Sequence, residues 1–178
     1  MNWMKKILAG ILAACMMLSM TACSDTSWVY DYGDGEKIPS GLYIVFMMNG
    51  YLSISSQEDY DSSKDVMKQT IEGLSSEEWI RQEAERYAGE FVAVDRKFDE
   101  LGLTLTESDE NTIDTSTETM WAYYSTLYEQ NKVSQSTYRR IVENNKKREL
   151  IFQKYYGTGG IEEVPNDSLM VHFKENYA

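Results

Sequence analysis

Few residues of this chain have the type and surroundings that covalent chemistry needs. The sequence contains two cysteines, Cys15 and Cys23, and a lone histidine, His172. A single histidine without a neighbouring cysteine cannot form a typical zinc site, and a general base needs a positioned partner, which is not recognisable around His172. Cys15 lies in an apolar stretch, whereas Cys23 directly follows Met20-Thr21-Ala22, which ends in small residues. Cys23 is therefore the strongest candidate for a covalent modification.

The residues before Cys23 are typical of a secretory signal. Lys5 and Lys6 form a positive n-region, and an apolar stretch over residues 7–20 leads to the small residues. A cysteine at this place resembles the bacterial lipobox, in which the sulfur is acylated and the cysteine becomes the new N-terminus. An uncleaved membrane helix is the alternative, but the stretch is shorter than the ~20 residues that a spanning helix needs. We therefore expect a cleaved signal peptide over residues 1–22, lipidation at Cys23 and a tether over residues 23–27.

Acidic residues are abundant, but their spacing does not indicate a catalytic or metal site. Pairs such as Glu77/Glu78 are typical of solvated faces and helix starts. Asp59, Asp61 and Asp65 offer oxygen ligands, but their spacing lacks the glycine and the terminal glutamate of a calcium loop. The motifs G-x-x-x-x-G-K, G-x-S-x-G and H-E-x-x-H do not occur. We therefore assign no catalytic residue, no metal and no cofactor from the sequence.

The charge balance limits the class of partner. The chain carries 17 basic and 29 acidic residues, a formal net charge of −12 at pH 7. Such a surface argues against nucleic acid, whose phosphates need lysine and arginine, and against a polybasic contact with anionic lipid. Contact with the membrane is therefore expected through the lipid at Cys23.

The pattern after the tether predicts a small β-hairpin followed by a buried helix. Trp28, Tyr30 and Tyr32 alternate with other residues at the period of a strand. Residues 40–54 are apolar nearly all round, which is typical of a helix buried between others. The expected order is a strand at 28–32, a turn at 33–35, a strand at 36–38, a helix at 40–54, a loop at 55–64 and a short helical or irregular piece at 65–73.

Three helices with recognisable caps follow, and a final amphipathic helix is expected over residues 166–177. Ser75 and Glu78 have the spacing of a capping box, Thr106 begins the second helix, and Ser134 caps the third. The expected inward stripes are Ile80, Ala84, Tyr87, Phe91, Val94, Phe98 and Leu101; Ile113, Thr117, Met120, Tyr124 and Leu127; and Tyr138, Ile141, Val142, Asn145, Arg148, Phe152 and Tyr155. The sum is an all-α fold, an extended multi-helix lobe over residues 28–178 behind a small N-terminal β-hairpin.

Aromatic and methionine side chains are the feature with binding potential. Trp121, Tyr124 and Tyr128 crowd one expected helix, and Met47 and Met48 crowd an earlier one. Such stripes usually face a core, but methionine adapts to varied apolar partners and exposed apolar patches mark interaction sites. The five residues are therefore candidates for contacts with unfolded segments of other proteins.

The order of these elements resembles the N-terminal chaperone-like lobe of the SurA/PrsA-type extracytoplasmic foldases, especially lipoprotein forms from Gram-positive bacteria. The stretch K-F-D-E-L-G-L-T-L-T-E-S-D-E at residues 97–110 is similar to the phrase that joins two helices of that lobe. The stretch at residues 164–177 is similar to the phrase that leads into the family's parvulin domain, with Pro165 where a capping Ser or Thr is usual. The lipobox, D-G-E-K-I-P at residues 34–39 and N-K-V-S-Q-S-T-Y at residues 131–138 fit the same order.

The resemblance implies a lipid-anchored lobe on the extracytoplasmic face of the cell membrane that binds unfolded or nascent exported polypeptides. The family's catalytic residues belong to the parvulin domain and cannot be carried over to this chain, which we expect to be a partial or truncated form. Two alternatives stay open: the front of a complete peptidyl-prolyl cis-trans isomerase, and a lipoprotein scaffold for envelope assembly without chaperone activity.

Overall fold

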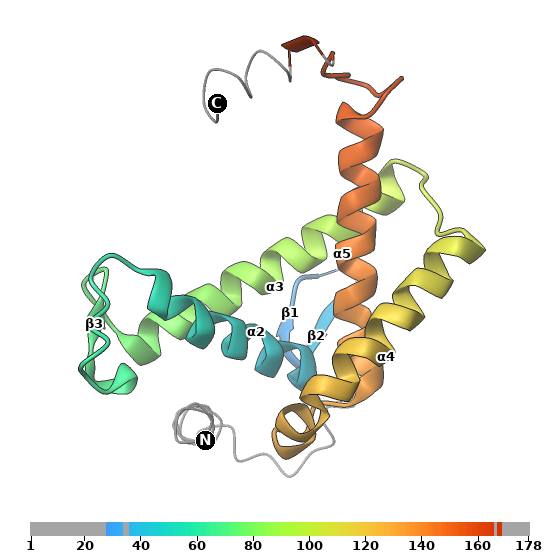
Figure 1. The fold of residues 1–178 in the computed structure, drawn as a ribbon. Coiled ribbons are helices and arrows are strands. Elements are labelled where there is room, and N and C mark those ends of the chain that lie inside the picture. Colours follow the sequence, from blue (N-terminus) through green and yellow to red (C-terminus); the bar gives the residue numbers. More distant parts are fainter. Residues whose placement is uncertain (1–27, 34–35, 166, 169–178) are drawn as a thin grey trace.

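The computed structural model describes residues 28–33, 36–165 and 167–168 (Figure 1). The expected signal peptide, the tether with Cys23, and most of the expected helix over residues 166–177, including His172, lie outside the described residues. In the described part, the fold is mostly helical, with a small two-stranded hairpin at its N-terminal end. This agrees with the fold class that the sequence predicts.

The N-terminal hairpin pairs β1 (Trp28–Asp31) with β2 (Lys37–Pro39) in antiparallel register. Gly33, in the connection, has φ +82°, a conformation that glycine adopts without steric cost. The hairpin is fastened to α3 (Ser76–Glu100), because Arg96 forms a 2.7 Å ion pair with Glu36 and the Tyr30 hydroxyl donates to Glu85. The predicted hairpin is therefore confirmed, and it is a fixed part of the fold.

Helix α2 (Ser40–Ser53) lies against α3, and the main core lies between them and the hairpin (Figure 1). Gly50 permits the close approach, since a Cβ there would lie 3.1 Å from the Ile80 carbonyl oxygen. The core residues are Ile38, Leu42, Tyr43, Phe46, Ala84, Ala88, Phe91 and Val92. The predicted buried helix is thus confirmed, although Leu52 on α2 is 50% exposed.

The segment after α2 contains a hairpin that the sequence did not predict. The short 3-10 helix η2 (Ile54–Ser56) extends α2, and a second one, η3 (Val66–Lys68), comes before β3 (Thr70–Ile71) and β4 (Leu74–Ser75), which pair antiparallel. The expectation of a short helical or irregular piece at 65–73 is therefore only partly correct. Glu72 and Gly73 have φ 51° and 81°, so both connecting residues have positive φ, as in the turns that suit two-residue hairpins. Ile71 is fully buried and belongs to a second core cluster with Ile54, Trp79 and Ile80.

Helix α3 is the long central element and begins where the sequence predicts. The Ser75 hydroxyl accepts a 3.3 Å hydrogen bond from the backbone N–H of Glu78, which satisfies one of the free donors at the helix start. The predicted stripe is buried at Ile80, Ala84, Phe91 and Phe98, and half-buried at Tyr87, Val94 and Leu101. Because a period of 3.5 residues drifts against the 3.6 of a straight helix, the buried face also takes in Trp79, Ala88 and Val92.

Helices α4 (Glu107–Gln130) and α5 (Gln135–Tyr156) form a second pair, and α5 crosses α3 (Figure 1). The end of α5 projects past this crossing. Three helix starts that the sequence predicts are thus confirmed, since Thr106 and Ser134 also cap their helices.

The inward face of α5 differs from the predicted stripe in its middle. Asn145 and Arg148 are exposed, whereas Asn144 is buried. The Asn144 side-chain amide donates to the Phe91 carbonyl at 2.9 Å and to Asp95 at 3.2 Å on α3. Lys147 lies beside it and forms a 3.0 Å ion pair with Asp95. The contact between the two helices therefore combines the apolar packing of Ile141 with these polar contacts, and an apolar stripe could not locate the polar part.

Candidate functional site

The five residues proposed for contacts with unfolded polypeptides separate into two groups. Trp121, Tyr124 and Tyr128 lie together on α4, whereas Met47 and Met48 lie on α2. Met48 is 3% exposed and is one of the buried residues of α2. Met47 is half-buried and packs against both core clusters. The surface that remains as a candidate is therefore on α4.

The α4 side chains form a connected set of rings with one member from α5. Trp121 stacks on Tyr128 with centroids 5.7 Å apart, and Tyr138 of α5 lies 4.9 Å from Tyr128 and 6.4 Å from Trp121. Tyr124 meets Tyr128 edge-on at 6.5 Å, and Tyr123 lies 6.5 Å from Tyr124. We call these five residues the aromatic surface. Such pairs contribute about 0.5–1.5 kcal/mol beyond the area they bury.

Exposure differs along the aromatic surface. Tyr123 is 78% exposed and Tyr124 is 46% exposed, whereas Trp121, Tyr128 and Tyr138 are half-buried. The half-buried Tyr128 contacts Tyr124, which in turn contacts Tyr123. The predicted inward stripe of this helix is wrong at Met120 and Tyr124, since both are exposed. The rings therefore offer apolar and π surface to a partner without a change in the fold.

The hydroxyl groups of the inner rings stay neutral. Burial raises the pKa of Tyr128, and the neighbouring Tyr138 raises it further. Burial also raises the pKa of Tyr138, against the opposing effect of its hydrogen bond with Tyr128. At physiological pH these residues present apolar faces and neutral polar edges, with no charge of their own.

Capping fixes the two helices that carry the rings. The Thr106 hydroxyl accepts from the backbone N–H of Asp109, and the Asp109 carboxylate accepts from the Thr106 backbone N–H at 2.9 Å, a complete capping box. At the other end, the Asn131 amide donates to the Leu127 carbonyl at 2.8 Å, and Lys132 turns the chain with φ 61°. Because Asn131 and Val133 are buried in this connection, Tyr138 is held next to Tyr128.

Ion pairs fasten α4 to α5 on the side of the capping box. Arg139 contacts Glu110 at 2.6 Å and Asp114 at 2.7 Å, and Lys146 contacts Asp109 at 3.3 Å. Beside Arg139 is an open hollow of about 260 Å³ between the two helices, lined by Asp114, Thr117, Glu118, Gln135, Ser136 and Arg139. The hollow borders the aromatic surface, since Glu118 precedes Trp121 by one helical turn and Tyr138 precedes Arg139.

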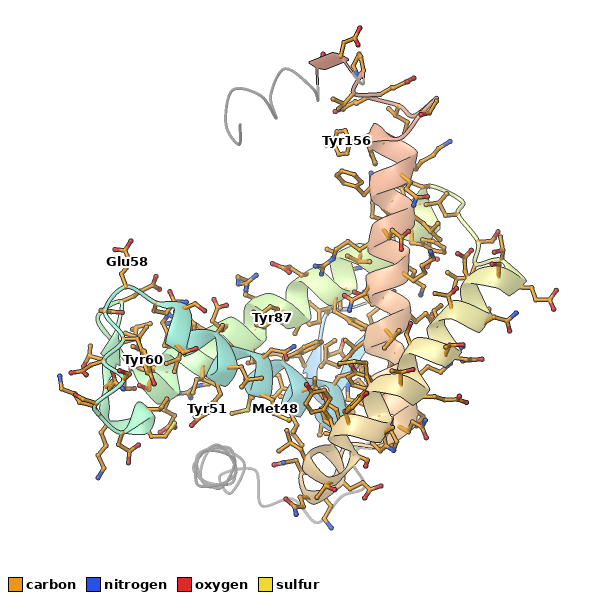
Figure 2. All side chains as sticks on the ribbon, viewed as in Figure 1. Met48, Tyr51, Glu58, Tyr60, Tyr87 and Tyr156 are labelled. Carbon is orange, nitrogen blue, oxygen red and sulfur yellow. The ribbon has the colours of Figure 1, made fainter. Side chains whose placement is uncertain are left out.

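The sequence did not identify two members of the aromatic surface, nor a second pair of exposed rings at the end of α5. Tyr138 was expected in a core stripe, and Tyr123 was not assigned a role, although its place beside Tyr124 was the available signal. At the end of α5, the prediction that Phe152 belongs to the inward stripe is wrong, since Phe152 is 62% exposed and lies 5.1 Å from Tyr156. Figure 2 shows Tyr156 at the projecting end of α5, away from the core.

No group of three or more described His, Cys, Asp or Glu residues is arranged to hold a metal ion. None of the helices that the structure describes is long and apolar enough to cross a membrane. The lipidation candidate Cys23 lies outside the described residues.

Comparisons with known proteins do not add a relative. No family model matches the chain, and neither a curated protein nor a solved structure matches it.

Proposed function

We propose that this chain is a chaperone or foldase lobe that binds unfolded segments of exported polypeptides. In this proposal, residues 28–178 form an extended helical lobe, which the lipid at Cys23 anchors on the extracytoplasmic face of the cell membrane. The observation that carries the proposal is the aromatic surface, above all Tyr123 and Tyr124, which are exposed on a capped and ion-paired scaffold.

The arrangement of the rings suits a partner without a fixed structure. Aromatic side chains dominate binding energy at interfaces, and tyrosine and tryptophan are enriched among the residues that contribute most. They offer large contact areas while losing few rotamers, because each has only two side-chain torsions. A surface of linked rings with neutral hydroxyls can therefore accept different apolar segments by shallow contacts.

The placement that the leader predicts fits this activity. A lobe anchored by a lipid at Cys23 would lie where exported chains emerge and are still unfolded. The excess of acidic over basic residues in the chain would keep the lobe away from anionic lipid headgroups and leave the aromatic surface open to polypeptides.

Suppression of client aggregation tests the proposal. The purified protein, added in molar excess to a chemically unfolded client during dilution, is expected to reduce light scattering. The variant Tyr123→Ser/Tyr124→Ser should lose most of this effect. The matched control is Phe152→Ser/Tyr156→Ser, which also removes exposed aromatic rings but from the end of α5. No suppression by the parent protein would overturn the proposal, and equal losses in both variants would overturn the assignment to the aromatic surface.

A further inference from the structure

The charges on α4 are all of one sign. Between Lys97 and Lys132 the sequence contains no lysine, arginine or histidine. The charged residues of α4 are Glu107, Asp109, Glu110, Asp114, Glu118 and Glu129. The helix that carries four of the five rings of the aromatic surface is therefore exclusively acidic.

The basic residues of α5 neutralise only part of this charge. Arg139 and Lys146 pair with Asp109, Glu110 and Asp114 in the first half of α4. Within the part of the chain that the structure describes, Glu118 and Glu129 take part in no ion pair. Glu107 in the first turn of α4 also has no ion pair among the described residues, but it lies fourteen residues before Trp121, so Glu118 and Glu129 are the uncompensated carboxylates near the rings.

These two carboxylates lie near rings of the aromatic surface along the helix. Glu118 precedes Trp121 by three residues, so the two side chains are neighbours on the helix surface. Glu129 directly follows Tyr128 in the last turn of α4, where there is no basic residue. The carboxyl end of a helix carries a partial negative charge that favours cations, and the nearest lysine is Lys132 in the connection to α5.

Aromatic faces and carboxylates attract the same kind of group. A lysine or arginine side chain over the face of tryptophan or tyrosine is attracted by the ring quadrupole, and its apolar stem covers hydrophobic surface. A neighbouring carboxylate adds a charge-assisted hydrogen bond. Glu118 also lines the open hollow between α4 and α5, where Asp114 and Arg139 are the other charged residues.

We infer that the aromatic surface selects basic unfolded segments: stretches of polypeptide in which aromatic or aliphatic residues alternate with lysine or arginine. The inference rests on the proposed function and names its class of client. The rings supply the contact area, and Glu118 and Glu129 supply the preference for positive charge.

The test is the affinity of the full chain for three fluorescently labelled, unstructured peptides. The peptides share the same aromatic and aliphatic residues and carry lysine, glutamine or glutamate at the intervening positions. At low ionic strength, fluorescence anisotropy should show the lysine peptide binding about tenfold tighter than the glutamate peptide, a difference of about 1.4 kcal/mol. The difference should shrink as salt is added, since exposed charges are screened within about 10 Å at 0.1 M salt.

A matched pair of variants distinguishes the effect of Glu118 and Glu129 from the effect of the protein's overall negative charge. Glu118→Gln/Glu129→Gln should lose most of the preference for lysine. Glu58→Gln/Glu162→Gln removes the same charge from exposed positions elsewhere and should keep the preference. Figure 2 shows Glu58 at the end of the molecule remote from α4. Circular dichroism of each variant verifies that the fold is intact.

The outcomes distinguish the two proposals. Equal binding of the three peptides would overturn the selection for basic segments and leave the binding of apolar clients standing. Equal loss of the preference in both variants would overturn the role of Glu118 and Glu129. Absence of binding to every peptide would overturn the proposed function together with this inference.

Discussion

The α2–α3 pair and the α4–α5 pair both carry aromatic side chains, but they place them differently. In the first pair, Phe46 and Phe91 are buried, with centroids 5.9 Å apart in the main core. In the second pair, Tyr123 and Tyr124 are exposed. Many side chains of α2 are buried, whereas on α4 only Ile113 and Thr117 are.

The interactions that join the helices also differ between the two pairs. Apolar packing joins α2 to α3. Polar contacts have a larger part at α5: ion pairs of Arg139 and Lys146 join it to α4 beside the ring contacts of Tyr138, and the buried amide of Asn144 joins it to α3. The α2–α3 pair thus buries its rings in the core that stabilises the fold, whereas the α4–α5 pair leaves Tyr123 and Tyr124 exposed to a partner. The following changes test this division, from the largest expected effect to the smallest.

The largest effect is expected in the apolar core. Leu42 on α2 is fully buried, so Leu42→Ala removes buried methyl groups and leaves a cavity, which costs about 2–5 kcal/mol in the free energy of unfolding. Urea denaturation followed by circular dichroism measures it. Leu127→Ala on α4 is the matched substitution, and its smaller loss is expected because Leu127 is only half-buried. A larger loss of unfolding free energy at Leu127 than at Leu42 would contradict the difference between the two helix pairs.

The polar contact between α5 and α3 should give the next effect. Asn144→Ala removes the hydrogen bonds to Phe91 and Asp95, and we expect a loss of about 1–3 kcal/mol because the partner groups are left less well satisfied. Asn145→Ala is the control, since the neighbouring amide is exposed. The same denaturation experiment applies, and similar losses at both positions would contradict the inward orientation of Asn144.

The aromatic surface should matter for binding and little for stability. Tyr124→Ala removes an exposed ring that contacts Tyr128, and truncation of an interface residue that contributes to binding costs more than about 1 kcal/mol. The affinity for an unfolded client, measured by anisotropy, should fall about tenfold, while the urea midpoint stays near that of the parent. An unchanged affinity, or a large loss of stability, would show that the ring of Tyr124 serves the packing of the fold, as the rings of α2 do, and not binding.

The smallest effect concerns the pH dependence of the start of α4. Hydrogen bonds from Thr106 and then the ion pair with Lys146 hold the pKa of Asp109 below its usual value. Below about pH 4, the usual range for aspartate, the unfolded chain therefore binds a proton at Asp109 before the folded chain does. Its contribution to stability is present above that pH and is lost as the pH falls through the folded pKa.

The variant Asp109→Asn should show a shallower fall of the unfolding midpoint below about pH 4 than the parent. Asp99→Asn, at an exposed position near the end of α3, is the matched control. Thermal unfolding over a series of acidic buffers measures both. Parallel profiles for Asp109→Asn and the parent would show that the Asp109 carboxylate does not stabilise the start of α4.

The helices could be predicted from the sequence because their signals are local. Ser75, Thr106 and Ser134 each accept from a backbone N–H at the start of a helix, and this depends only on nearby residues. The hairpin at β3 and β4 could not be predicted in the same way, since its turn places Glu72 at φ 51°. Glutamate gives no signal for that conformation, and the burial of Ile71 that stabilises it is a tertiary effect.

The site could be predicted only in part for a related reason. The crowding of Trp121, Tyr124 and Tyr128 was visible, because these residues are close in the sequence. The contribution of Tyr138 depends on how α5 returns beside α4, and the burial of Met48 is likewise a tertiary effect. The register of α5 was missed at Asn144, because a buried amide that donates to a backbone carbonyl does not follow an apolar period.

The central claim is that unfolded polypeptides bind at the aromatic surface, and site-specific photo-crosslinking tests it most directly. A photoreactive amino acid is placed at Tyr123 in one protein and at Phe152 in another, since both side chains are highly exposed. With an unfolded client present, we predict crosslinks from position 123 and few from position 152. Equal crosslinking from the two positions, a preference for position 152, or no crosslinks at all would contradict the account.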